Sequence, residues 1–140
     1  MSDVADWHQV FAQIGSAIVL SPPRTIFEVA EAEQQIREPL PDDLSRLYLV
    51  TDRVFDHDGL WYSIWPLERL VANALGPLSP ATGLPRDWIA FGDDGTGDPF
   101  CVPPEGSPIY HWSMIGRESQ RVASRLDEFL IGWIEGSIEV

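Results

Sequence analysis

The stretch FGDDGTGDPF, from Phe91 to Phe100, places three glycines and three aspartates between two aromatic residues. Asp94-Gly95 is a pair typical of tight turns, in which glycine adopts positive φ angles, and Gly97 permits a bulge beside the turn. The apolar residues on each side, Ile89–Phe91 and Phe100–Val102, are typical of short strands. The stretch therefore predicts a β-hairpin and an antiparallel pair of strands.

Two other kinds of loop share this composition, and both fit less well. A calcium loop of the EF-hand type that began at Asp93 would need ligands where Gly95 and Gly97 stand. A phosphate-binding loop would need a lysine and a helix after the glycines, and neither follows. We expect no metal and no cofactor, while an enzyme or small-ligand site built on Asp93, Asp94 and Asp98 stays open as an alternative.

The charge balance bears on the kind of partner. The chain has 22 acidic residues, nine basic residues that are all arginine, and a net charge of −13. Such a charge repels phosphate backbones and disfavours direct binding of nucleic acid. It suits a basic protein partner, because complementary potentials speed encounter and suppress wrong partners, although solubility alone would explain it equally well.

The pattern along the chain predicts helices on both sides of a block of strands. Helices are expected at about 3–15, 25–37, from Asp42 to about Val50, 66–75 and 124–136, and strands at 60–64, 88–91, 100–102 and 107–112. Short connections between the strands favour hairpins, with a mixed arrangement left open. We expect an α+β fold with a four- to six-stranded antiparallel sheet and helices mainly on one side. The 140 residues fit a single domain, with the N-terminal helix packed on it.

The last helix carries two specific expectations. Ser124 and Asp127 have the spacing of a capping box, with Asp in place of Glu. Leu126, Phe129 and Leu130 form an apolar stripe with Trp133, so Trp133→Ala is expected to cost about 3–5 kcal/mol.

Residues that often carry chemistry are sparse in this chain. Cys101 is alone, so it forms no internal disulfide, and its apolar neighbours predict a buried thiol. His8, His57 and His111 lack the spacing of metal ligands. No apolar run approaches the ~20 residues of a membrane span, and Asp3 and Asp6 stand where a secretory signal carries positive charge. We expect a cytoplasmic protein with no catalytic residue and no membrane contact.

A series of short motifs carries a further signal. In chain order they are Glu33, Leu40-Pro41-Asp42-Asp43-Leu44, Leu47-Tyr48, Tyr62–Leu70 with Trp65, Pro66 and Leu67, Ile89–Phe100 with Gly92, Gly95, Gly97 and Asp98, Ile109–Trp112, and Leu126–Leu130 with Phe129 and Leu130. Over about residues 25–136 this order resembles the SUKH superfamily, the Smi/Knr-type domain of fungal glucan-synthesis regulators and bacterial toxin-immunity proteins. One departure is the acidic loop Thr51–Asp58, which delays the usual turn until Gly59.

The resemblance implies an α+β domain that works by protein–protein contact and has no active site. Its commonest bacterial role is the neutralisation of a secreted polymorphic toxin, often a nuclease or deaminase. The resemblance therefore implies a non-enzymatic immunity protein, with a regulatory scaffold for cell-wall or glucan synthesis as the alternative. Its partner would be a cognate toxin or another protein of basic character.

Aspartates and aromatic residues near the hairpin are the first candidates for a partner-binding surface, because exposed aromatic residues are common at the centre of protein interfaces. The expected members of this surface are Asp56, Asp58, Trp61, Asp93, Asp94 and Tyr110.

Overall fold

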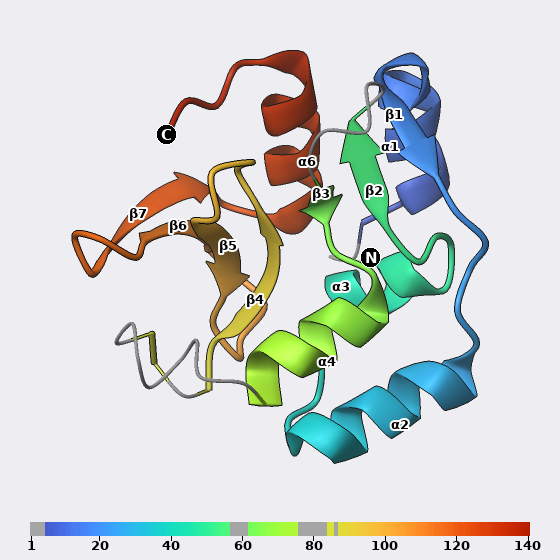
Figure 1. Cartoon of the computed structure of the whole chain (residues 1–140). Coiled ribbons are helices and arrows are strands. Elements are labelled where there is room, and N and C mark those ends of the chain that lie inside the picture. The colour runs from blue at the N-terminus through green and yellow to red at the C-terminus, as the bar shows by residue number, and fades with distance from the viewer. Residues whose placement is uncertain (1–4, 57–61, 76–83, 86) are drawn as a thin grey trace.

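The computed structural model describes residues 5–56, 62–75, 84–85 and 87–140, and it confirms the α+β class (Figure 1). The helices are α1 (Trp7–Ile14), followed by the short 3-10 turn η1 (Gly15–Ala17), α2 (Ile26–Ile36), α3 (Asp42–Tyr48), α4 (Leu67–Leu75) and α6 (Leu126–Glu135). The strands are β1 (Ile18–Leu20), β2 (Val54–Asp56), β3 (Tyr62–Ile64), β4 (Ile89–Asp93), β5 (Pro99–Val102), β6 (Ile109–Ser113) and β7 (Glu118–Ala123). Within these ranges, no helix has the length and apolar character needed to cross a lipid bilayer.

All the strand pairs are antiparallel, and they divide into two sheets rather than one. Strands β1, β2 and β3 form a three-stranded sheet, and β4 to β7 form a four-stranded sheet in chain order. The amide of Trp65, just after β3, donates a hydrogen bond of 2.7 Å to the carbonyl of Phe91 in β4. Figure 1 shows β3 beside β4, so this bond links the two sheets where they meet.

The larger sheet buries a different set of side chains on each face. Residues alternate between faces along a strand, so Phe91, Phe100 and Ile109 lie in the main core with α6. The opposite face carries a second cluster that includes Cys101 and Trp112, with Ala90, Trp65 and Leu84. The helices therefore cover mainly one face of this sheet, as expected.

The main core joins the first and last helices. Trp7 and Phe11 of α1 are buried and stack on one another with ring centroids 5.8 Å apart. Phe129 and Leu130 of α6 are fully buried, and α6 contacts both α1 and α3. Figure 1 shows α6 between α1 and the four-stranded sheet, so the core closes only when both ends of the chain are in place.

Helix starts differ from the sequence-based expectations in two places. Helix α1 begins after Asp6, whose side chain caps the Gln9 amide at 3.2 Å, rather than near residue 3. The capping box expected at Ser124 is wrong, because Arg125 occupies the N-cap of α6 and makes no side-chain cap. Ser124 lies one residue too early and instead accepts a hydrogen bond from Arg121.

A capping box does occur at the start of α2. The Thr25 hydroxyl accepts from the Glu28 amide at 3.1 Å, and the Glu28 carboxylate accepts from the Thr25 amide at 3.0 Å. This reciprocal pair satisfies two backbone donors that the helix itself leaves unpaired. It fixes where α2 begins, which matters because α2 forms one wall of the groove described below.

Three strands were not predicted from the sequence. Strands β1 and β2 are three residues each, too short for an alternating pattern to show. The sequence indicated only an acidic loop at 51–58, but Val54 is fully buried and Asp52 is 5% exposed. Strand β7 is polar, and as the edge of its sheet it leaves most of its side chains exposed, so hydrophobic alternation could not reveal it.

Candidate functional site

The hairpin of Asp93 to Asp98 is held by its own aspartates. Gly95 and Gly97 have φ angles of 91° and 106°, which glycine adopts readily. The Asp93 Oδ1 atom accepts from the Gly95 amide at 2.8 Å, and Oδ2 accepts from the Trp65 indole nitrogen at 2.7 Å. Arg69 also reaches Asp93 Oδ2 at 3.4 Å. The buried carboxylate of Asp93 thus ties the turn to the segment between β3 and α4.

Asp94 is engaged on both oxygens. Its Oδ1 accepts from the amide and hydroxyl of Thr96 at 2.8 and 2.6 Å, and its Oδ2 lies 2.9 Å from His111 Nε2. Burial acts to raise the pKa of Asp94, but the hydrogen bonds from Thr96 and His111 outweigh it and hold the pKa below its usual value. Asp98 accepts from the Met114 amide at 3.1 Å and so ties the hairpin to the β6–β7 turn.

The fold brings together three potential metal ligands that the sequence did not group. Asp94, Asp98 and His111 each offer a ligand atom, and these atoms lie within 4.8 Å of one another. The hydrogen bonds just described already occupy both Asp94 oxygens, one Asp98 oxygen and the facing nitrogen of His111. Because these bonds account for the arrangement, we assign no metal to this cluster.

The six residues expected on a partner-binding surface do not form one described patch. Asp58 and Trp61 lie outside the described residues, and Asp56 ends β2, where its backbone pairs with Ile18. The side chains of Asp93 and Asp94 point into the fold and are satisfied there.

Tyr110 is partly exposed and differs in this from the two inward-facing aspartates. Its ring stacks on Trp88 with centroids 4.8 Å apart, over the second cluster of the four-stranded sheet. The side chain of Tyr110 therefore reaches solvent beside that cluster.

The residues of the family-like motifs occupy structural positions. Leu40 is buried, and its amide donates to the Glu33 carboxylate at 2.7 Å, which ties the end of α2 to the start of α3. Pro41 is the N-cap of α3. The Leu67 amide, at the start of α4, donates to Asp52 at 3.1 Å. These residues set the positions of α2, α3 and α4 relative to one another.

A partly buried ion pair at the start of α4 was missed by sequence reasoning. Arg24 Nε donates to Asp52 Oδ1 at 2.8 Å, while its other nitrogens reach Glu28 at 2.7 Å and Glu68 at 3.3 Å. Burial acts to raise the pKa of Asp52, but the hydrogen bonds from Arg24 and the Leu67 amide outweigh it and lower the pKa. No local pattern signals this pair, because its two partners are 28 residues apart in sequence.

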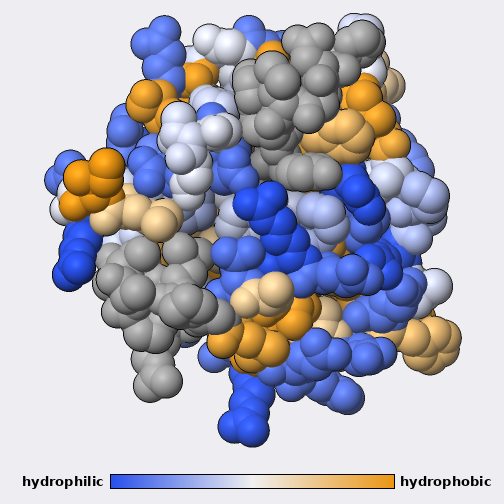
Figure 2. Space-filling view, viewed as in Figure 1, coloured by the Kyte–Doolittle hydropathy of each residue, from blue (hydrophilic) through white to orange (hydrophobic). Residues whose placement is uncertain are grey.

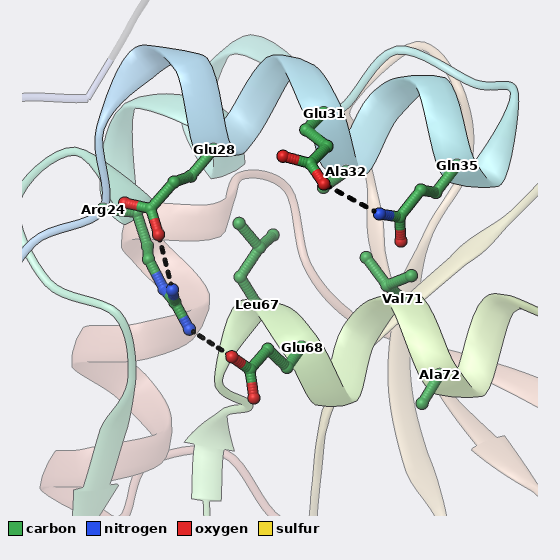
Figure 3. Close-up of a pocket in the computed structure, with 9 residues that line it drawn as sticks. All are labelled: Arg24, Glu28, Glu31, Ala32, Gln35, Leu67, Glu68, Val71 and Ala72. Atoms are coloured by element: carbon green, nitrogen blue, oxygen red, sulfur yellow. Dashed lines mark hydrogen bonds and ion pairs between the residues drawn. The ribbon is translucent and has the colours of Figure 1, made fainter.

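A groove of about 380 Å³ lies between α2 and α4 (Figure 3). Its lining residues are Arg24, Glu28, Glu31, Ala32, Gln35, Leu67, Glu68, Val71 and Ala72. In Figure 3 the acidic side chains stand along its borders, and the apolar side chains of Leu67 and Val71 rise from α4 toward α2. The groove therefore joins an apolar floor to an acidic rim.

A second hollow of about 430 Å³ lies at the start of α3, near the segment before β6. Its lining residues are Pro41, Asp42, Asp43, Glu105, Gly106, Ser107 and Arg125. Asp43 is partly committed to the fold, since its Oδ1 accepts from the Ala5 amide at 2.8 Å. This hollow lacks the aliphatic floor of the α2–α4 groove.

Cys101 is a structural residue rather than a nucleophile. Its side chain is fully buried in the second cluster, and burial raises the pKa of its thiol to about 12. A thiol with such a pKa stays protonated at neutral pH and does not attack.

The comparisons with known proteins agree with this architecture. A search of curated proteins found no significant match. The SMI1 / KNR4 family (SUKH-1) matches the chain over residues 25–132, from the capping box of α2 into α6. Since that match covers most of the chain, the protein belongs to the SMI1 / KNR4 (SUKH-1) family.

Proposed function

We propose that this protein is a non-enzymatic binding module, a bacterial immunity protein that binds and neutralises a cognate polymorphic toxin inside the cytoplasm. The observation that carries the proposal is membership of the SMI1 / KNR4 family together with a net charge of −13. An acidic domain complements the basic surface that a nuclease or deaminase uses for its nucleic-acid substrate. Such a partner would be held by direct protein contact, without nucleic acid, membrane or cofactor.

The chemistry of the described side chains supports a role without catalysis. Asp93 and Asp94 are committed to hydrogen bonds within the fold, and the Cys101 thiol stays protonated. Catalytic groups normally combine a shifted pKa with access to a substrate cleft. Asp52, whose pKa is lowered, is instead buried, where it pairs with Arg24 and accepts a hydrogen bond from the Leu67 amide at the start of α4.

Rescue from toxicity is the direct test of this function. The gene beside this one would be examined for a large modular protein with a small C-terminal toxin domain, and that domain would be expressed with and without this chain. We expect growth only when both are present, and co-purification of the two proteins. An unrelated protein of similar size and negative charge is the control, and it should give no protection. Failure to protect against any adjacent toxin would contradict the immunity role.

A regulatory scaffold is the second candidate, because the matched family takes its description from SMI1 and KNR4. A scaffold would hold partners of cell-wall or glucan synthesis together rather than inhibit one of them. Deleting the gene separates the two roles. If the protein is an immunity protein, cells that lack the gene die only when they meet the toxin. If it is a scaffold, cells that lack the gene show a cell-wall defect even without the toxin.

A further inference from the structure

We propose that the groove between α2 and α4 is the docking site for a helix of a partner protein that carries an apolar side chain flanked by arginine or lysine. This inference rests on the proposed function, because it assumes that the chain acts through a protein partner. It adds the place at which that partner binds and the chemistry that holds it.

The floor of the groove is an apolar stripe that leads out of the core. Leu67, Val71 and Leu75 recur every four residues on α4 and therefore lie on one face of the helix. Leu67 is 4% exposed, Val71 is half-buried and Leu75 is 61% exposed, so the stripe rises from the core to the surface. An apolar side chain placed above Val71 and Ala72 would continue the packing that Leu67 begins.

Carboxylates border this floor on both helices. Glu28 and Glu31 stand on α2, and Glu68 stands on α4 with its side chain 85% exposed. In Figure 2 a hydrophobic patch over α4 is bordered by hydrophilic side chains above and below. Cationic side chains on either side of an inserted apolar residue would meet these carboxylates. Such a partner would therefore match the groove both in its apolar floor and in its negative charge.

Arg24 is the basic residue of the groove lining, and its charge is already matched. It bonds Asp52 beneath it and Glu28 and Glu68 beside it. Among the lining residues one positive side chain faces three carboxylates, those of Glu28, Glu31 and Glu68, so the groove keeps an excess of negative charge. This excess disfavours an acidic segment, and it disfavours a second copy of a chain that carries −13.

The shape of the groove favours a helical occupant. Its walls are two helices, α2 and α4, and a partner helix can lay one apolar face along such a groove. Phe27, which is 80% exposed, lies one turn before Glu31 on α2 and offers an aromatic contact beside the rim. Exposed aromatic residues of this kind are frequent anchors in protein interfaces.

The probe is a synthetic amphipathic helical peptide of leucine, lysine and arginine, and its acidic counterpart carries glutamate at each basic position. Both would be titrated into the isotope-labelled full chain and followed by NMR. Ala72 and Ala74 are both exposed on α4, but Ala74 does not line the groove, so Ala72→Trp fills the groove and Ala74→Trp is its matched control. Neither substitution alters the charge, which separates docking from general electrostatic attraction.

We expect the basic peptide to shift resonances of α2 and α4 and the acidic peptide to bind far more weakly. Ala72→Trp should weaken binding of the basic peptide by at least about tenfold, while Ala74→Trp stays close to wild type. Glu31→Arg should also weaken binding by about tenfold. The same charge change at exposed Glu118 on β7 should have less effect, because salt screens distant charges.

Three results would overturn the docking site: shifts located away from α2 and α4, equal binding by the two tryptophan variants, or equal binding of the two peptides. Thermal melting of each variant would verify that it is folded. The rescue assay separates the two proposals. Full rescue by Ala72→Trp would reject the groove and leave immunity standing, whereas peptide docking without any rescue by wild type would reject immunity alone.

Discussion

At the scale of single residues, the hairpin depends on backbone geometry as well as on the hydrogen bonds of its aspartates. Gly97 has a φ of 106°, yet a Cβ placed there would meet no atom within 4 Å. Any cost of Gly97→Ala must therefore come from the backbone angle itself. Gly15 is the matched control, because its Cβ would also meet nothing and its φ is −58°.

We expect Gly97→Ala to lower the free energy of unfolding by about 1–3 kcal/mol. Gly15→Ala should leave it unchanged or raise it by up to about 1 kcal/mol, since alanine restricts the unfolded chain. Urea unfolding of both variants measures the difference. Equal stability of the two would mean that the hairpin does not require the positive φ angle.

Asp52 provides a second residue-scale prediction, which concerns pH. The folded pKa of Asp52 lies below its usual value of 3.8, so its charge stabilises the fold above that pH. This contribution is lost as the pH falls through the folded pKa. Asp52→Asn keeps an acceptor for the Leu67 amide but loses the ion pair with Arg24, which still holds Glu28.

We expect Asp52→Asn to cost about 1–2 kcal/mol at neutral pH, because Arg24 keeps Glu28 and Glu68 as partners and is partly exposed. The gap between wild type and variant should narrow as the pH drops below 3.8. Denaturant unfolding at several pH values between neutral and acid checks both points. A gap that stayed constant into acid would show that the charge of Asp52 contributes nothing to stability.

At the scale of secondary-structure elements, α6 holds the main core together through aromatic contacts. Phe129 is fully buried, and its ring centroid lies 4.5 Å from that of Phe100 and 5.7 Å from that of Phe91. Trp133 lies one turn later and contacts Phe100 edge-on at 5.0 Å, but it is only partly buried. The sequence-based estimate for Trp133 assumed full burial and is therefore too large.

We expect Phe129→Ala to cost about 3–5 kcal/mol, which is the range for removing a fully buried aromatic ring. Trp133→Ala should cost about half as much, roughly 2 kcal/mol, because part of its ring already contacts water. Urea unfolding of the two single variants gives both values. A larger loss for Trp133 than for Phe129 would show that the side chain of Trp133 carries more of the core than its exposure indicates.

Elements with a strong local pattern were predictable, and those defined by distant partners were not. The hairpin, α2 and the apolar face of α3 follow from turn chemistry and helical spacing in short windows. Strand β7 is polar and forms because β6 pairs with it, so its own residues did not reveal it. The α2–α4 groove joins residues from Arg24 to Ala72, and local patterns do not show which helices lie side by side.

At the scale of the whole molecule, negative charge and apolar surface are divided unequally. The sequence suggested that the hairpin aspartates form an acidic surface. In the structure most of their carboxylate oxygens accept hydrogen bonds within the fold. The carboxylates of the α2–α4 groove border an open apolar floor instead. At this groove part of the negative charge therefore lies beside partly exposed aliphatic side chains, and a partner could use both.

The contact between α1 and α6 has a consequence for how the protein is made. Helix α1 leaves the ribosome well before α6, so its buried residues wait for a helix that comes much later in the chain. Until α6 is present, Trp7 and Phe11 lack part of the packing that buries them. The emerging chain then exposes apolar surface that chaperones bind. Folding of the main core is therefore expected to wait until α6 has been synthesised, and a chain that stops before α6 is expected to be prone to proteolysis.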